Sequence, residues 1–311
     1  MPCQRQSTRE RTGTGCAGAR GTPGMLVPAW GVEVTWLKVV ILGVVQGLTE
    51  FLPVSSSGHL VLARRLLGVT PPAGASGVLW EVVLHMGTLV AVVVVLRREV
   101  WLVLRGLACG LLACRRGVRA ALREEPGFAL ALLIVLGSIP AGLVGVVFKD
   151  ALEALFEKLS LVAGALLVTG TILFATRYAP KHARGGRVSW LSAVIVGCAQ
   201  AVAILPGISR SGATISAGLF AGLERAEAAR FSFLLSIPAV GGAGLLELRH
   251  LDALPTESLA PFLAGGVVSA VVGLAALVLL LRVVEAGKLH HFAYYCWAVG
   301  AGALTWLLVG G

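Results

Sequence analysis

The chain has 311 residues, of which 57% are hydrophobic and only 14% charged, and its mean hydropathy is +0.87. A soluble domain of this size cannot expose so much apolar surface to water, so the composition excludes a soluble protein and indicates a polytopic membrane protein. The formal net charge of +10 comes largely from arginines beside apolar runs. That distribution is typical of the positive-inside rule and argues against a nucleic-acid partner.

The N-terminal segment differs from the rest of the chain. Residues 1–24 are rich in Arg, Gly and Thr and lack the continuous apolar core of a signal peptide. We expect this segment to be disordered or to be an over-extended start upstream of Met25. Residues 25–311 are expected to form a single integral membrane domain.

Eight apolar runs approach the length of about 20 residues that crosses a hydrocarbon core. In chain order they are 36–52, 79–96, 127–148, 160–178, 189–205, 232–248, 261–283 and 292–309. The alternating pattern of an outer-membrane barrel is absent, so the sequence predicts an all-α protein of the inner-membrane type.

Loop charges orient these runs. The segment 97–126 carries seven arginines against three glutamates. We predict that it is cytoplasmic and contains a helix lying in the membrane interface. The loop 149–159 is then outside, and the basic stretch 177–187 is inside again.

Two of the runs are interrupted by proline, glycine and serine, and the interruptions match each other. Five residues recur 154 positions later: Gly43, Gln46, Ser55, Ser57 and Gly58 as Gly197, Gln200, Ser209, Ser211 and Gly212. Broken helices are tolerated at membrane depth where protein or water satisfies their backbone. We therefore predict two re-entrant helical hairpins, 36–68 and 189–222, each followed by three transmembrane helices. Because three is odd, the halves 36–178 and 189–309 form an inverted-topology repeat.

The first break carries an ionisable residue within an apolar run. Gln46 and Glu50 lie four residues apart, on one face of a helix. Pro53 ends that helix, and three serines precede a second helix that begins near Gly58. A carboxylate at membrane depth is by default a functional residue, and a helix N-terminus favours an anion.

The second break repeats this arrangement and adds Arg210, whose guanidinium group suits phosphate oxygens. Together the breaks predict one site for a phosphate head group on a lipid tail. In a phosphoryl transfer there, Arg210 and a divalent metal would offset charge, Glu50 would hold the metal or act as a base, and His59 would exchange protons.

The runs Gln46–His59 and Pro206–Thr214, with the segments Glu81–Thr88 and Phe231–Pro238, resemble the undecaprenyl-diphosphate phosphatase family, UppP/BacA. The similarity extends from about residue 36 to the end. It implies hydrolysis of undecaprenyl diphosphate to the monophosphate carrier of peptidoglycan synthesis, and resistance to bacitracin. It also implies an inverted-repeat fold in the bacterial inner membrane, an active site open to the periplasm, and a divalent cation, Mg²⁺ or alternatively Ca²⁺.

The family's functional residues transfer by position. Its acidic motif falls on Gln46 and Glu50, its serine on Ser56, its histidine on His59 and its phosphate-binding arginine on Arg210. Because Gln46 carries no charge, Glu50 is expected to serve as base or metal ligand largely alone. The nucleophile stays open between Ser56, a water molecule and His59. Further phosphate contacts are expected from hydroxyl groups: Ser55, Ser57, Ser209, Ser211 and Thr214.

Several alternatives remain at this stage. A transporter of lipid phosphates or small anions would use the same inverted-repeat site. Arg210 could be a structural partner of Glu50, and Glu81 and His85, four residues apart, could support the site or pair within the bundle. Besides the lipid substrate and membrane lipids, a homodimer is a further partner left open.

Overall fold

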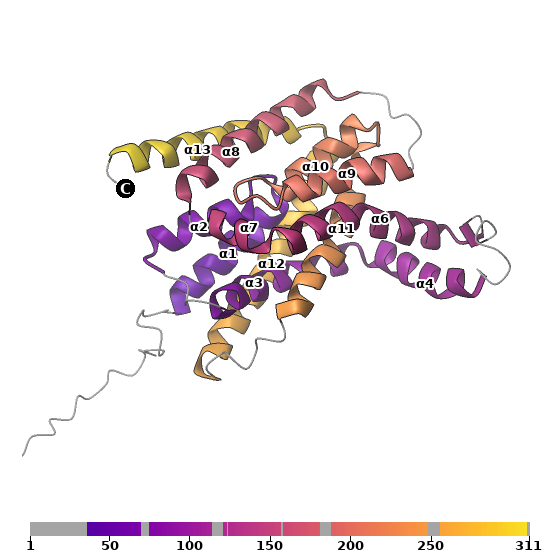
Figure 1. Ribbon diagram of the computed structural model, residues 1–311, viewed down its shortest axis with the longest axis horizontal. Helices are drawn as coiled ribbons and strands as arrows, with labels where there is room; N and C mark the ends of the chain where they lie inside the picture. The colour runs from indigo at the N-terminus through magenta and orange to yellow at the C-terminus, as the bar shows by residue number, and fades with distance from the viewer. Residues whose placement is uncertain are drawn as a thin grey trace, which may run out of the picture.

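The computed structural model describes residues 36–69, 75–113, 121–122, 124–156, 158–180, 188–247 and 256–309, and every regular element within these ranges is a helix (Figure 1). Residues 1–24, for which disorder or an over-extended start is predicted, lie outside the described residues. Helices of the first half are α1 (Trp36–Phe51), α2 (Ser56–Leu66), α3 (Ala75–Val95), α4 (Arg97–Ala113), α6 (Pro126–Val147), α7 (Lys149–Phe156), α8 (Leu159–Ala175) and the 3-10 turn η2 (Thr176–Tyr178). Helices of the second half are α9 (Trp190–Val202), α10 (Arg210–Phe220), α11 (Arg225–Glu247), α12 (Thr256–Glu285), the 3-10 turn η4 (Leu289–His291) and α13 (Phe292–Val309).

Each of the eight predicted apolar runs contains a helix in the part of the chain that the structure describes. Among the described residues, five segments are long and apolar enough to cross a membrane: Pro126–Val147, Leu159–Tyr178, Arg225–Leu246, Ala260–Glu285 and Leu289–Val309. The helices α1 and α9 have only 16 and 13 residues, fewer than the roughly 20 that a span requires, and each is followed after a break by an 11-residue helix. An all-helical polytopic membrane protein with two broken segments is therefore confirmed.

The arginine-rich segment after α3 also forms the predicted helix, α4. Its Gly106 and Gly110 pack closely against Gly127 and Phe128 of α6. Its other side exposes large apolar residues, including Trp101 and Leu112. The position of α4 in the membrane interface stays a prediction.

The two halves pack reciprocally. The first helix of each broken pair contacts a long helix of the other half: α1 lies against α12, and α9 lies against α6. The equivalent glycines Gly43 and Gly197 make both approaches possible, because a Cβ atom on either would collide with the carbonyl oxygen of Gly265 or Gly137, respectively. Small residues are what allow helix backbones to approach closely in lipid.

The end of α1 is held by the core. Phe51 is fully buried and meets Phe233 of α11 edge to face, with ring centroids 5.7 Å apart. Gly273 of α12 contacts the same ring closely, since a Cβ atom there would lie 2.8 Å from it. This packing fixes the position of the neighbouring Glu50.

Candidate active site

The second helix of each break is capped by the same kind of serine hydrogen bond. Ser55 caps α2 by accepting a hydrogen bond from the amide of Gly58 at 3.3 Å, and Ser209 caps α10 by accepting one from the amide of Gly212 at 3.1 Å. Ser55 has φ +71°, the only positive φ among the described non-glycine residues. A serine in this conformation is uncommon, and such strain is often found at functional sites.

The breaks also contact each other. The amide of Gly207, which has φ +96°, points to the Ser57 hydroxyl across 3.5 Å. Thr169 of α8 fixes the second break from behind, donating to the Gly207 carbonyl at 2.8 Å and accepting from the Ser209 amide at 3.0 Å. The breaks that precede α2 and α10 are therefore in direct contact, which brings the N-termini of these two helices close together.

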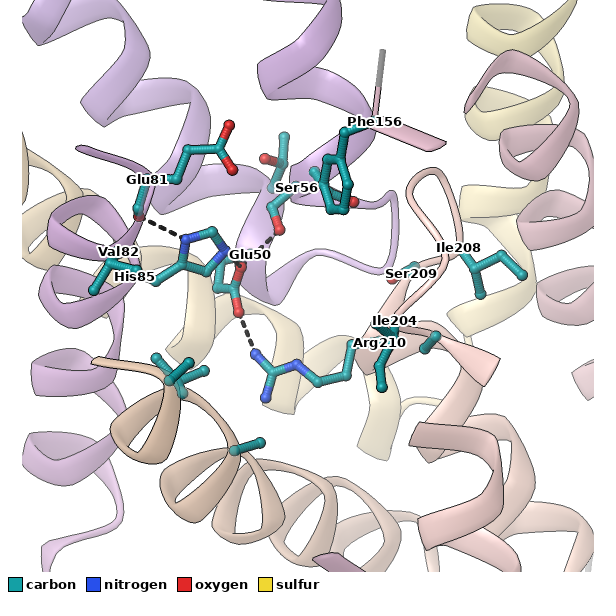
Figure 2. A pocket seen from close by; sticks show the side chains of 16 residues that line it. Glu50, Ser56, Glu81, Val82, His85, Phe156, Ile204, Ile208, Ser209 and Arg210 are labelled. Carbon is teal, nitrogen blue, oxygen red and sulfur yellow. Dashed lines mark hydrogen bonds and ion pairs between the residues drawn. The ribbon is translucent and has the colours of Figure 1, made fainter. Parts of the chain in front are cut away.

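Glu50 is the point at which these elements converge (Figure 2). Its side chain is only 5% exposed, and its Oε1 forms an ion pair with the guanidinium group of Arg210. Its Oε2 accepts hydrogen bonds from Ser56 Oγ at 2.6 Å and from Gln46 Nε2 at 3.0 Å. Arg210 thus pairs with Glu50, as the structural alternative for this arginine predicted, and it lies in the pocket as well.

A pocket of about 300 Å³ opens beside this carboxylate, and its lining is divided by polarity. Helices α1, α2, α3 and α10 contribute most of the polar side, which includes Glu50, Ser56, Glu81, His85, Ser209 and Arg210. The end of α7, the break after α9 and the middle of α11 contribute the apolar side, which includes Phe156, Ala203, Ile204, Ile208, Ala239 and Ala243. Such a pocket suits a molecule with a charged head and an apolar tail.

His59 is not brought to the pocket. Its Nδ1 donates to the Ser55 carbonyl at 2.8 Å, and its Nε2 lies 2.9 Å from the hydroxyl of Tyr295 on α13. The two rings stack with centroids 5.6 Å apart. His59 therefore links the first break to α13, and a role in proton exchange stays a prediction.

The predicted phosphate-binding hydroxyls are divided between the pocket and the packing around it. Ser57 and Ser209 line the pocket. Ser55 and Ser211 are buried and contact the hydroxyls of Ser57 and Ser209, respectively, at 3.2 Å. Thr214 is fully buried and donates to the Arg210 carbonyl at 2.7 Å, so it fixes the first turn of α10.

His85 contacts the central carboxylate, a contact that the sequence did not predict. Its Nδ1 donates to the Glu81 carbonyl at 2.8 Å, which directs Nε2 toward Glu50 Oε2 at 3.5 Å (Figure 2). Glu81 also lines the pocket and pairs with Arg64 of α2, whereas His85 approaches Glu50. The signal was the four-residue spacing, which puts both on one face of α3.

The donor set around Glu50 does not fit a resident divalent cation. Mg²⁺ and Ca²⁺ require about six or more oxygen ligands. Both oxygens of Glu50 already contact hydrogen-bond donors or a guanidinium group, and Gln46 does not line the pocket. Among the described residues no group of three or more His, Cys, Asp or Glu side chains is placed to hold a metal ion.

Fold and site together define a class: an integral membrane protein in which two broken helices place a buried carboxylate and its arginine partner in an amphipathic pocket. The family described as "Bacitracin resistance protein BacA" matches residues 39–302, and the chain belongs to this family. It is 46% identical over 274 residues to the undecaprenyl-diphosphatase of Desulfatibacillum aliphaticivorans, covering 87% of this chain and 98% of that protein. It is 41% identical over 271 residues to the undecaprenyl-diphosphatase of Methanosphaera stadtmanae, covering 85% and 95%.

Proposed function

We propose that the protein hydrolyses undecaprenyl diphosphate to undecaprenyl phosphate and so recycles the lipid carrier of peptidoglycan synthesis. The observation that carries this proposal is the contact of Glu50 with both Ser56 and Arg210 in a pocket with one polar and one apolar side. Family membership and the printed names of the relatives support the same activity. Removal of the diphosphate, the form that bacitracin sequesters, accounts for the resistance in the family's description.

The geometry favours Ser56 as the nucleophile and Glu50 as its base. Ser56 Oγ lies 2.6 Å from Glu50 Oε2, within the range for proton transfer from a nucleophile to a base. In the first step, Ser56 Oγ bonds to the terminal phosphorus, the bond from that phosphorus to the bridging oxygen breaks, and Glu50 accepts the hydroxyl proton. Water then hydrolyses the phosphoserine. The contacts of His59 with Ser55 and Tyr295 argue against attack by that imidazole.

Charge on the transferred group would be stabilised by Arg210 and by the two helix N-termini. Ser56 and Arg210 are the first residues of α2 and α10, where free backbone N–H groups favour anions. Arg210 keeps 20% of its side chain exposed, so it can contact a phosphate while it remains near Glu50. A preorganised cation of this kind stabilises the transition state without reorganisation during the reaction.

The apolar side of the pocket would bind the first isoprene units of the substrate. A volume of about 300 Å³ is far too small for a whole long prenyl chain, so the remainder of that chain must extend from the pocket into lipid. A transporter for the head group would need the anion-binding groups alone. The hydrogen bond from Ser56 to Glu50 is the additional part that favours a hydrolase.

The finer architecture is also part of the proposal: the halves are inverted in the membrane, the protein is in the bacterial plasma membrane, and the pocket opens to the exterior. The reciprocal packing of α1 on α12 and of α9 on α6 supports the inverted repeat. Loop charges put α7 outside, and Phe156 at the end of α7 lines the pocket. A reporter fused to the C-terminus should be external, and a cytoplasmic signal would contradict the inverted arrangement.

Trapping of the phosphoenzyme tests the reaction. Purified protein mixed with prenyl diphosphate labelled in its terminal phosphate, then quenched in acid with limited time for hydrolysis, should carry label on Ser56. Ser56→Ala should lose both label and turnover. Thr49→Val is the matched control, because Thr49 lines the same pocket but donates to the carbonyl of Val45 at 2.6 Å, and it should retain the label. Full turnover in Ser56→Ala would exclude the serine mechanism.

A further inference from the structure

The carboxylates that line the pocket are both neutralised by arginine. Glu50 pairs with Arg210, and Glu81 pairs with Arg64. The position one helical turn before Glu50 holds Gln46, an uncharged side chain that is fully buried. Its Nε2 donates to Glu50 Oε2 at 3.0 Å, which occupies a lone pair that a cation would need.

A diphosphate that enters this pocket brings charge that the protein does not balance. A prenyl diphosphate carries about three negative charges near neutral pH, of which the terminal phosphate contributes about 1.5 to 2. The two guanidinium groups are matched by the two carboxylates. His85 is the remaining ionisable group on the polar wall, and it adds at most a single positive charge. Anions taken out of water need compensation, so the substrate must bring cations with it.

We propose that the divalent cation enters the pocket bound to the diphosphate of the substrate, and that the described residues of the pocket do not hold it in the substrate's absence. Mg²⁺ fits this role, because it keeps several of its waters and is commonly bound through substrate phosphates with one or two carboxylates. The inference rests on the proposed function, since it takes a prenyl diphosphate as the ligand. It assigns the cation to the substrate complex instead of to a resident site on Glu50.

Gln46 gives the inference a test that is specific to this chain. In Gln46→Glu, a second carboxylate would replace the amide whose nitrogen now lies 3.0 Å from Glu50 Oε2. Two carboxylates at that separation would supply two anionic ligands, and waters would complete the coordination of a cation there without substrate. The repeat provides a matched control, because Gln200 is equally buried at the equivalent position of α9 but has Ile204 where α1 has Glu50.

The experiment is equilibrium dialysis of the purified full chain in detergent, with Mn²⁺ as the probe for Mg²⁺. The ligand is a methylene-bridged prenyl diphosphonate, which cannot be hydrolysed. Manganese and phosphorus are measured in the same protein compartment, against a protein-free compartment that contains the diphosphonate in detergent. We expect wild-type protein to retain about one manganese for each bound diphosphonate and less than about a tenth of that amount without it.

The outcomes separate the inference from the proposed function. Manganese retained by wild-type protein without diphosphonate, and lost in Glu50→Gln, would overturn the inference. Diphosphonate retained in the presence of Mn²⁺ but without manganese would also overturn it, while leaving the function intact. Failure to retain the diphosphonate at all would overturn both. Gln46→Glu should gain manganese binding without diphosphonate by about tenfold, and Gln200→Glu should not. If Gln46→Glu fails to fold, the wild-type comparison still decides.

Discussion

Removal of the Arg210 charge should cost more stability than removal of the Glu50 charge. In Arg210→Met, the Glu50 carboxylate, 5% exposed, loses its ion-pair partner. Leaving one charge of a buried pair uncompensated costs about 3 to 5 kcal/mol. The hydrogen bonds from Ser56 and Gln46 remain, so we expect the lower end, about 3 kcal/mol. Glu50→Gln instead leaves a guanidinium group that is 20% exposed and can reach water, at a cost of about 1 kcal/mol.

The double variant makes this comparison a thermodynamic cycle. With both charges removed, no unpaired ion is left, so the combined cost should fall below the sum of the single costs by about 1 to 2 kcal/mol. Unfolding can be followed in mixed micelles as the denaturing detergent fraction rises, with the fluorescence of the seven tryptophans as the signal. Equal losses in the two single variants, or additive losses in the double variant, would refute the assignment of Glu50 as the more deeply buried charge.

Three further predictions concern packing, the polar wall and the apolar wall. Gly197→Ala should destabilise the protein by about 1 to 3 kcal/mol in the same detergent assay, because the added methyl group would collide with the carbonyl oxygen of Gly137. Gly164→Ala is the control: its methyl group would meet nothing within 4 Å, so this variant should be neutral or stabilising. Equal effects would contradict close packing of α9 on α6. His85→Leu should lower kcat/KM by about tenfold or more. His85→Gln should recover part of the lost kcat/KM, because glutamine restores an N–H donor. Unchanged kcat/KM in His85→Leu would show that this residue does not act in the site. Ala243→Trp should raise KM by about tenfold for a long prenyl diphosphate and less for isopentenyl diphosphate, and equal increases would contradict an apolar wall that binds the chain.

Much of the fold could be predicted from the sequence because its signals are local. Apolar runs of about 20 residues specify spans. The prolines and serines after α1 and α9 specify breaks, and both were located to within a few residues. Glu50 and Arg210 could be assigned to one site because a buried charge needs a partner and the two breaks carry matching residues 154 positions apart.

Side-chain direction could not be predicted, because it depends on contacts that are distant in sequence. His59 lies three residues after Ser56 on α2, which suggests a shared face, yet its ring turns toward Tyr295, 236 residues away. His85 reaches Glu50 because the Glu81 carbonyl fixes its Nδ1, while the Glu81 carboxylate pairs with Arg64 of α2, 17 residues earlier in the chain. The four-residue spacing of Glu81 and His85 is visible in the sequence, but the contacts that His59 and Glu81 make with other helices have no periodic signature there.

The matching positions of the two breaks carry different chemistry on the two sides of the pocket. Glu50 and Ile204 occupy equivalent positions, 154 residues apart, and both line the pocket, the first on its polar side and the second on its apolar side. Ser56 and Arg210 are equivalent too, and both contact the same carboxylate, one through a hydroxyl and the other through a guanidinium group. A symmetric pair of breaks would give two identical anion sites. An amphipathic substrate with its reacting bond at one end needs a different residue at each equivalent position, which is the pattern that these two pairs show.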